Sequence, residues 1–261
     1  MEHPYAFDHL TYTEIRERSS AGWLAAVPTG CTEQQGPHLP VDFDTWFARV
    51  LLLAAAERAA HVYDVNALVL PAMPFGPTPE HRNYGSGYID VPAALHAHLV
   101  TAVLQSLADQ GFRRILVWRG CGGHALHSVV TRFNRDWAGR ARAFLPALPY
   151  HEIWCRIGDP GVPGGHADSF ATSIALHLRP DAVRTERIPA PETADVLWDD
   201  PQLDFTRYSR SGVIGDATHA SAQLGARLWE AVVDAAARQL QVAAQQPLVR
   251  TGGIRDGKET T

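Results

Sequence analysis

Apolar, β-rich segments alternate in this chain with segments of helical pattern, and this alternation constrains the fold more than any other feature. Strands and helices that alternate form βαβ units with a parallel sheet and right-handed crossovers. The expected strands are Trp23–Pro28, Ala67–Pro71, Arg114–Trp118 and Ala143–Pro149. The expected helices are Thr45–Ala60, Pro92–Gln110, Ser169–Leu178 and Ala220–Gln245. The sequence therefore predicts an α/β fold.

No composition shift divides the chain into separate domains. Its 261 residues are enough to bury one large core without disulfides. The Gly/Pro-rich stretch 158–165 is typical of a loop rather than a linker, because a helical pattern follows it at once. We expect one α/β domain over residues 1–250 and a polar C-terminal tail over residues 251–261.

Charge and hydropathy argue against two classes of partner. The formal net charge is −5, and the arginines are scattered rather than gathered in a basic stripe. We therefore expect neither nucleic acid nor a membrane surface as a partner. No apolar run has the length of a transmembrane helix, and the polar N-terminus lacks the apolar core of a secretory signal. Three cysteines in such a chain are typical of reduced thiols, so we expect a cytoplasmic protein.

Polar, glycine-bearing segments follow the expected strands. They are Gly30–Asp44 (GCTEQQGPHLPVDFD), the punctuated stretch Pro74–Tyr88, and Arg119–His124 (RGCGGH). Ligands of parallel sheets bind beyond the carboxyl ends of the strands. We therefore expect the three loops to meet at one rim of the sheet.

Acids, a thiol and imidazoles in these loops indicate metal or acid–base chemistry, although each has a plainer alternative. Glu33 and Asp44 offer oxygen ligands for a divalent cation, but Asp44 could equally cap the following helix. Cys121 could be a metal ligand, a nucleophile or a small buried residue. His124 could be its base, but a spacing of three residues in a loop does not establish contact.

Two further loops add histidines. His166 precedes the expected helix at 169 and is an acid–base candidate, because imidazole titrates near neutral pH. Asp168 in the same loop could serve only to cap that helix. His81 lies in the glycine-rich loop PEHRNYGSG, which fits either a substrate lip or a solvated loop.

Taken in order, these segments resemble the creatininase family, the creatinine amidohydrolases and their relatives. Gly30–Asp44 matches the family pattern G-S-x-E-Q-H-G-P-H-L-P-x-x-x-D, and Arg119–His124 matches N-G-H-G-G-N. The P-E-H loop recurs at Pro79–His81, H-A-G-E-x-E-T-S at His166–Ser173, and G-V-x-G-D-P-T at Gly212–Thr218. The match spans about residues 22–240.

The resemblance implies a three-layer α/β/α sandwich with a mainly parallel central sheet. It also implies an amidohydrolase that acts on a C–N bond of a small molecule, in a cyclic amide, a formamide or a peptide-like group. Family members use two divalent ions, which activate water and polarise the carbonyl. They are typically homo-oligomers, often hexamers, and we expect a homo-oligomer here.

The chain departs from the family pattern where the metals should bind. Glu33 and Asp44 keep the ligand acids, but the ligand histidine after Glu-Gln is replaced by Gln35, and that of the glycine-rich turn by Cys121. The two acids of the E-x-E-T-S stretch are replaced by serine and alanine. An amide is a weak ligand for transition metals, whereas a thiolate binds zinc. We therefore expect one ion rather than two (Zn, Fe or Mn), held by Glu33, Asp44 and Cys121.

We expect His166, Cys121 and Glu33 to act in catalysis. The substrate is expected to contact a wider set at the same rim: Gln35, His38, His81, Gly122, Gly123, His124 and Asp168. Two alternatives stay open. A metal-free enzyme on this scaffold could use Cys121 or His166 as nucleophile or base, in a hydrolysis or in an amide- or ring-forming step of biosynthesis. A non-catalytic subunit of an oligomer is the other alternative.

Overall fold

Four parallel strands form the centre of the fold in this computed structural model, which describes residues 3–192 and 195–248. The strands are β1 (Leu24–Thr29), β2 (Ala67–Val69), β3 (Arg114–Arg119) and β4 (Arg142–Phe144). They lie in the order β2-β1-β3-β4, and all three pairings are parallel. The predicted parallel sheet is confirmed.

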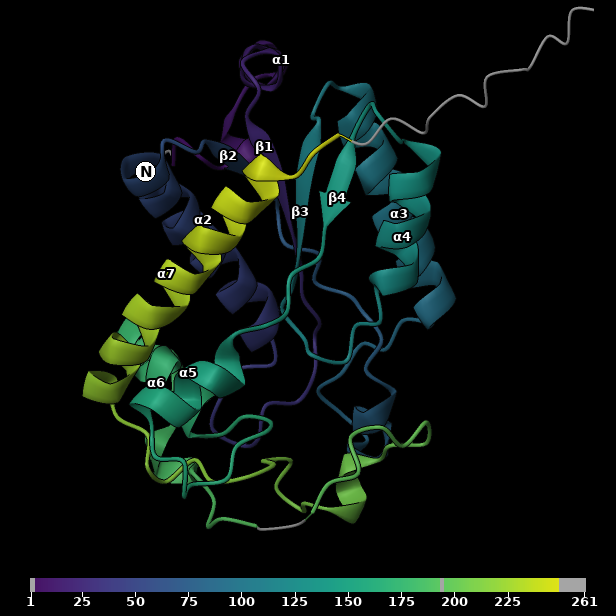
Figure 1. Cartoon of the computed structure of the whole chain (residues 1–261). Helices are drawn as coiled ribbons and strands as arrows, with labels where there is room; N and C mark the ends of the chain where they lie inside the picture. Colours follow the sequence, from purple (N-terminus) through teal and green to yellow (C-terminus); the bar gives the residue numbers. More distant parts are fainter. Residues whose placement is uncertain (1–2, 193–194, 249–261) are drawn as a thin grey trace, which may run out of the picture.

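Helices cover both faces of this sheet (Figure 1). Helices α2 (Phe43–Tyr63) and α7 (Ala222–Gln245) lie on one face, and α3 (Ala93–Asp109) and α4 (His127–Asp136) lie on the other. The three-layer α/β/α sandwich is therefore confirmed. No helix in the described part of the chain is both long enough and apolar enough to cross a membrane.

Shorter elements complete the fold. Helix α1 (Tyr12–Ser20) precedes β1, while α5 (Tyr150–Ile157) and α6 (Ser169–Leu178) pack against α7. Short 3₁₀ helices, labelled η1 to η5, lie at Phe7–His9, Pro79–Tyr84, Pro180–Ala182, Thr185–Arg187 and Phe205–Arg207.

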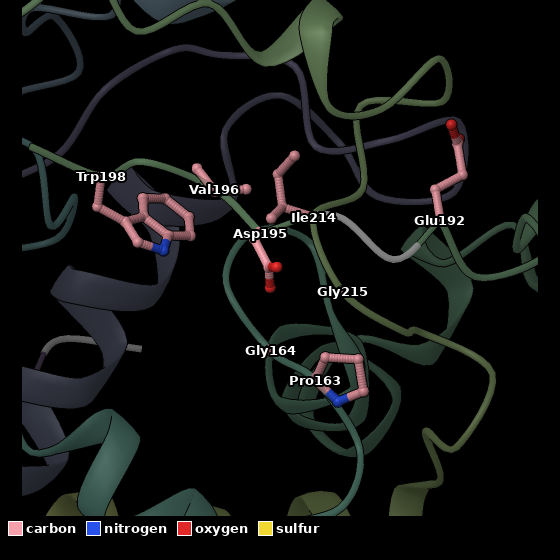
Figure 2. A pocket seen from close by; sticks show the side chains of 8 residues that line it. All are labelled: Pro163, Gly164, Glu192, Asp195, Val196, Trp198, Ile214 and Gly215. Carbon is pink, nitrogen blue, oxygen red and sulfur yellow. The ribbon is translucent and has the colours of Figure 1, made fainter. Parts of the chain in front are cut away.

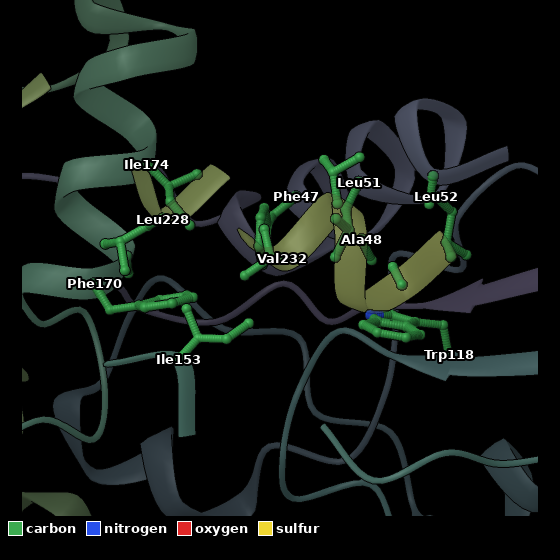
Figure 3. Packing of buried hydrophobic residues seen from close by; sticks show 14 of the residues in the cluster. Phe47, Ala48, Leu51, Leu52, Trp118, Ile153, Phe170, Ile174, Leu228 and Val232 are labelled. Atoms are coloured by element: carbon green, nitrogen blue, oxygen red, sulfur yellow. The ribbon is translucent and has the colours of Figure 1, made fainter. Parts of the chain in front are cut away.

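Two apolar cores lie on opposite faces of the sheet, because successive side chains of a strand point to opposite sides. On β3, Leu116 and Trp118 join the core with α2 and α7, whereas Ile115 and Val117 join the core with α3 and α4. Burying one large apolar side chain stabilises the fold by roughly 1.5–3 kcal/mol. Figure 3 shows part of the first core, with Phe47, Ala48, Leu51, Leu52, Trp118, Ile153, Phe170, Ile174, Leu228 and Val232 packed together.

The predicted elements differ from the observed ones mainly at their ends. The predicted strand Ala143–Pro149 is too long, since β4 ends at Phe144. Pro146 and Pro149 follow, and proline cannot donate a ladder hydrogen bond. The prediction missed α1, α4 and α5, which have only 9, 10 and 8 residues. In windows this short, helical periodicity is hard to recognise, although α4 and α5 do bury an apolar face. The predicted tail, residues 251–261, lies outside the described residues.

Candidate active site

The loops after β1 and β3 meet at the start of α2, as predicted from the strand ends. The amide of Gly120 donates to the carbonyl of Thr29 at 2.5 Å. A side chain at position 120 would collide with the carbonyls of Thr29 and Asp44. Glycine therefore lets the two strand ends and the first turn of α2 pack closely, and this packing brings Cys31, Asp44 and Cys121 together.

Three acidic groups, Cys31, Asp44 and Cys121, form what we call the sulfur side of the site, and they gather around the carboxylate of Glu33. The sulfur of Cys31 lies 3.0 Å from Glu33 Oε2 and 3.1 Å from Asp44 Oδ2. The sulfur of Cys121 lies 3.9 Å from Glu33 Oε2. Each of the four residues has one atom that could bind a metal, a sulfur or a carboxylate oxygen, and these four atoms lie within 4.8 Å of one another. The thiol of Cys31 has one proton and can donate it to only one of the two carboxylates at a time. The other carboxylate then faces the sulfur with no proton between them.

Burial makes the negative forms of these groups costly. Burial raises the pKa of Glu33 well above its usual range, and the nearby Cys121 and Asp44 add to the rise. Burial also raises the pKa of Asp44 to about 6, and that of the Cys31 thiol. A divalent cation would hold the same groups in their ionised forms. Two sulfurs and two carboxylates around one point are ligand types that zinc takes. A catalytic zinc would use three of them and keep its fourth position for water.

Sequence analysis missed Cys31 as a member of this cluster. The signal was present, because the family pattern has serine where this chain has Cys31, two residues before Glu33. The predicted ligand set Glu33, Asp44 and Cys121 is nevertheless brought together. Asp44 is not the cap of α2, since the N-cap residue is Asp42 and the carboxylate of Asp44 faces Cys31.

Two histidines form the imidazole side of the site, on the same carboxylate. His81 Nε2 lies 3.5 Å from Glu33 Oε2, and His166 Nδ1 lies 3.6 Å from Glu33 Oε1. Phe205 covers them, with its ring centroid 4.9 Å from that of His81 and 5.5 Å from that of His166. Burial lowers the pKa of His81 to about 2 and that of His166 to about 4, so both rings are neutral.

Glu80 is a second residue that sequence analysis missed. Its Oε1 lies 3.8 Å from His81 Nε2. Burial raises its pKa, and repulsion from Asp90 and Asp44 adds to the effect. The acid was visible in the P-E-H pattern, but only the 3₁₀ turn at Pro79–Tyr84 shows that it faces the site.

Three predicted substrate contacts lie on the loops that carry Glu33 and Cys121. The Gln35 amide nitrogen donates to Glu33 Oε1 at 3.3 Å, so Gln35 presents an N–H and not a lone pair to the carboxylate. Gly122 has open space where a side chain would be. A side chain at Gly123 would contact the carboxylate of Glu80 and the sulfur of Cys121. The two glycines therefore leave the turn open beside the acids.

Two other predicted contacts are engaged inside the fold. His38 is fully buried, and its Nε2 lies 2.8 Å from Thr172 Oγ1. The Asp168 carboxylate caps α6, since it accepts the amides of Phe170, Ala171 and Gly165. Their roles in substrate binding stay predictions.

His124 lies beneath the rim. Thr29 Oγ1 lies 3.3 Å from the Trp118 carbonyl, which can only accept its proton. The hydroxyl therefore accepts from His124 Nδ1 at 3.1 Å. Nε2 then carries the lone pair, and in the described structure it has no hydrogen-bond partner. One ring nitrogen lies within 4.8 Å of the sulfurs of Cys31 and Cys121. The two residues share only a backbone hydrogen bond, from the His124 amide to the Cys121 carbonyl at 3.5 Å, and no hydrogen bond among the described residues joins the imidazole to the thiol. The structure therefore does not show the predicted thiol–base pair.

A surface hollow of about 290 Å³ lies beside the imidazole side (Figure 2). Ile214 lines it and exchanges backbone hydrogen bonds with His166. Trp198 also lines it and meets Phe205 edge-on, with 5.8 Å between ring centroids. The ring of Phe205 therefore lies between Trp198 in the hollow and the two histidines, His81 and His166. None of the predicted site residues lines the hollow.

Comparison with known proteins places the chain among proteins with this fold. The family model described as "Creatininase: Creatinine amidohydrolase" matches residues 8–240. A protein of Mycobacterium tuberculosis named mycofactocin precursor peptide peptidase is 32% identical over 231 residues, which cover 85% of this chain and 86% of that protein. The creatinine amidohydrolase of Pseudomonas putida is 26% identical, with 86% and 91% covered. A mutant creatininase of Zn–Zn type superposes with a TM-score of 0.80 at 21% identity, covering 93% of this chain and 99% of that one.

Proposed function

The chain belongs to the creatininase family, and on this premise we propose that it is an amidohydrolase that cleaves an amide C–N bond. One observation carries the proposal: a single buried carboxylate, Glu33, stands between two thiols and an acid on one side and two neutral imidazoles on the other. Groups that can hold a cation and groups that can move a proton therefore face the same point. A scaffold protein would have no use for so many buried polar groups in one place.

The substrate we propose is peptide-like. By their names, one relative acts on a precursor peptide and another on creatinine, and the peptidase is the more similar of these two. The hollow beside Phe205 supports this choice, because it offers room for residues that flank the bond to be cleaved. A small ring such as creatinine would not need that space.

We propose that one zinc ion, rather than two ions, is held by three ligands from the set Glu33, Asp44, Cys121 and Cys31, with one position left to water. Thiolates favour zinc over manganese, which prefers oxygen ligands. Where the family pattern has a second histidine ligand, Gln35 turns an N–H toward Glu33. When bound, a zinc ion polarises the carbonyl of the substrate and lowers the pKa of water.

The side chains divide the remaining work. His166 presents Nδ1 toward Glu33 and can take a proton from the attacking water and return it to the leaving nitrogen. The open turn at Gly122 and Gly123 offers backbone amides to the carbonyl oxygen as it becomes negative. Phe205 covers the two imidazoles and limits their contact with water.

The test is elemental analysis of protein purified without chelators, combined with hydrolysis assays on synthetic peptides and on creatinine. We expect one zinc per chain, release of a new amine from a peptide, and loss of activity on chelation that zinc restores. Activity that survives complete metal removal would replace this proposal by the metal-free enzyme that uses Cys121 or His166. A metal-loaded protein that cleaves neither class of amide would contradict the proposed reaction.

A further inference from the structure

The two imidazoles beside Glu33 present opposite edges to it, and both edges are set by hydrogen bonds to one residue, Gln34. We propose that Gln34 is a positioning residue that fixes His81 as an N–H donor toward Glu33 and His166 as the ring with a free lone pair. The catalytic meaning of this inference rests on the proposed function. The protonation pattern itself can be measured without substrate or metal.

The orientation of the Gln34 amide is determined by two backbone groups. The Gly36 amide, which can only donate, lies 2.9 Å from Oε1. The Gly212 carbonyl, which can only accept, lies 3.1 Å from Nε2. Exchanging the oxygen and the nitrogen would break both bonds, so the assignment is unambiguous. Gln34 is buried, and its amide has no freedom to turn.

The second proton of the Gln34 amide settles the state of His81. Nε2 of Gln34 lies 3.0 Å from Nδ1 of His81, and an amide nitrogen can only donate. Nδ1 of His81 must therefore accept, and the proton of the neutral ring lies on Nε2. This N–H faces Oε2 of Glu33 at 3.5 Å and Oε1 of Glu80 at 3.8 Å. His81 consequently has no lone pair to offer to a cation or a proton at Glu33.

The backbone of the same residue settles the state of His166. Its Nε2 lies 2.7 Å from the carbonyl oxygen of Gln34, which can only accept. The proton of the neutral ring therefore lies on Nε2, and Nδ1 points its lone pair at Oε1 of Glu33, 3.6 Å away. A lone pair that faces a carboxylate oxygen leaves a place for a proton or a cation between them. His166 is thus the ring that accepts, while His81 is the ring that donates.

The packing around Gln34 supports this role. Gly212 has a φ of 85°, and any side chain there would overlap the Gln34 amide. The chain therefore needs glycine at position 212 both for the backbone conformation and for the space that the amide occupies. The same arrangement supports the proposed single ion, because it leaves the imidazole side with a single imidazole lone pair.

The test is two-bond ¹H–¹⁵N NMR of histidine side chains in metal-depleted, ¹⁵N-labelled protein at neutral pH. This spectrum shows which ring nitrogen carries the proton, and signals are assigned by their loss in His81→Asn and His166→Asn. We expect both rings to be protonated on Nε2 in the unsubstituted protein. A proton on Nδ1 of either ring would overturn the inference at once, whether or not any variant folds.

Gln34→Glu reverses one of the two rings and leaves the other as an internal control. A carboxylate at position 34 can only accept, so the proton of His81 is expected to move to Nδ1. His166 is expected to stay unchanged, because its partner is a backbone carbonyl that every substitution retains. Gln34→Met, which offers His81 no donor, is expected to give a mixture at His81 alone. A His81 signal that is the same in all three proteins would contradict the inference.

Activity measured on the same samples separates this inference from the proposed function. With the proposed reaction, kcat of Gln34→Glu falls on the order of 10²-fold while KM changes less, as expected for a lost acid–base arrangement. The predicted ring states without any amide hydrolysis would leave the role of Gln34 standing and contradict the reaction. Amide hydrolysis by a protein whose rings carry the proton on Nδ1 would support the reaction and contradict the role of Gln34.

Discussion

The sulfur side and the imidazole side of Glu33 differ in the kind of proton they hold. On the sulfur side, burial raises the pKa values of Cys31 and Asp44, and a bound cation would offset this by favouring their ionised forms. On the imidazole side, His81 and His166 stay neutral, and their protons are fixed by Gln34. The comparison indicates that the Glu33 carboxylate can take part both in ion binding and in proton transfer, because different groups lie on its two sides. The sulfur side is suited to hold an ion, and the imidazole side to move a proton.

The largest loss of activity is expected when Glu33, the residue that both sides share, is replaced. Glu33→Gln removes the negative charge that faces the thiols and both imidazoles, so we expect hydrolysis to fall by at least on the order of 10²-fold. Initial rates measure this loss, and circular dichroism confirms that the protein is folded. Glu57→Gln, at an exposed position of α2, is the matched control and is expected to behave as the unsubstituted protein. Equal activity in both variants would remove Glu33 from the reaction.

The sulfur side alone is tested by replacing its thiols. We expect Cys31→Ser and Cys121→Ser each to weaken zinc binding by at least 10- to 100-fold, because a hydroxyl is a poorer zinc ligand than a thiolate. Competition with a chromophoric chelator measures the affinity. Cys155→Ser, at an exposed position, is the matched control. If Cys31→Ser bound zinc as tightly as that control, Cys31 would be removed from the ligand set, and Cys121 would be the one thiol left in it.

Acid sensitivity tests the packing behind the imidazole side. Burial lowers the pKa of His38 to about 4, whereas an unfolded histidine titrates near its ordinary value of about 6.5. Between these values the unfolded chain binds more protons, so stability falls as the pH is lowered from about 6.5 toward 4. One such group contributes a slope of up to ~1.4 kcal/mol per pH unit.

Urea unfolding of metal-depleted protein across this range measures the slope. His38→Gln is expected to show a shallower slope than the unsubstituted protein. His61→Gln, at an exposed position of α2, is expected to show none of this change. Identical slopes in the two variants would mean that His38 has the same pKa in the folded and the unfolded chain.

The smallest effect is expected at the loop that carries His166. Asp168→Ala removes the cap of α6 and should lower the free energy of unfolding by about 1 kcal/mol. If the cap is its only role, KM stays unchanged and Asp168→Ser recovers the lost stability. A rise in KM that Asp168→Ser does not correct would show that the substrate touches this carboxylate.

The rim was predictable from the sequence because strand ends carry a strong signal. Glu33, Asp44 and Cys121 follow strands or begin the next helix, and a parallel sheet brings such positions together. The directions of individual side chains were not predictable. Cys31 turns its sulfur toward Glu33 and Asp44, and Glu80 turns inward on a 3₁₀ turn.

The family pattern also could not separate groups that serve the fold from groups that serve the site. His38 and Asp168 belong to matched segments, yet their polar atoms contact Thr172 and backbone amides. The role of Gln34 could not be predicted from the sequence, because it depends on hydrogen bonds to Gly36 and to Gly212, which is 178 positions away in the sequence. The expected homo-oligomer and the cytoplasmic location stay predictions.

Cobalt(II) titration of the metal-depleted protein tests most directly whether the sulfur side holds an ion. Cobalt reports its ligands by absorption, since each coordinated thiolate adds a charge-transfer band in the near ultraviolet. We predict saturation at one cobalt per chain, with a band that loses about half its intensity in Cys31→Ser and in Cys121→Ser and is lost in the double variant. A bound cobalt without that band, or a band unchanged by both substitutions, would contradict the account.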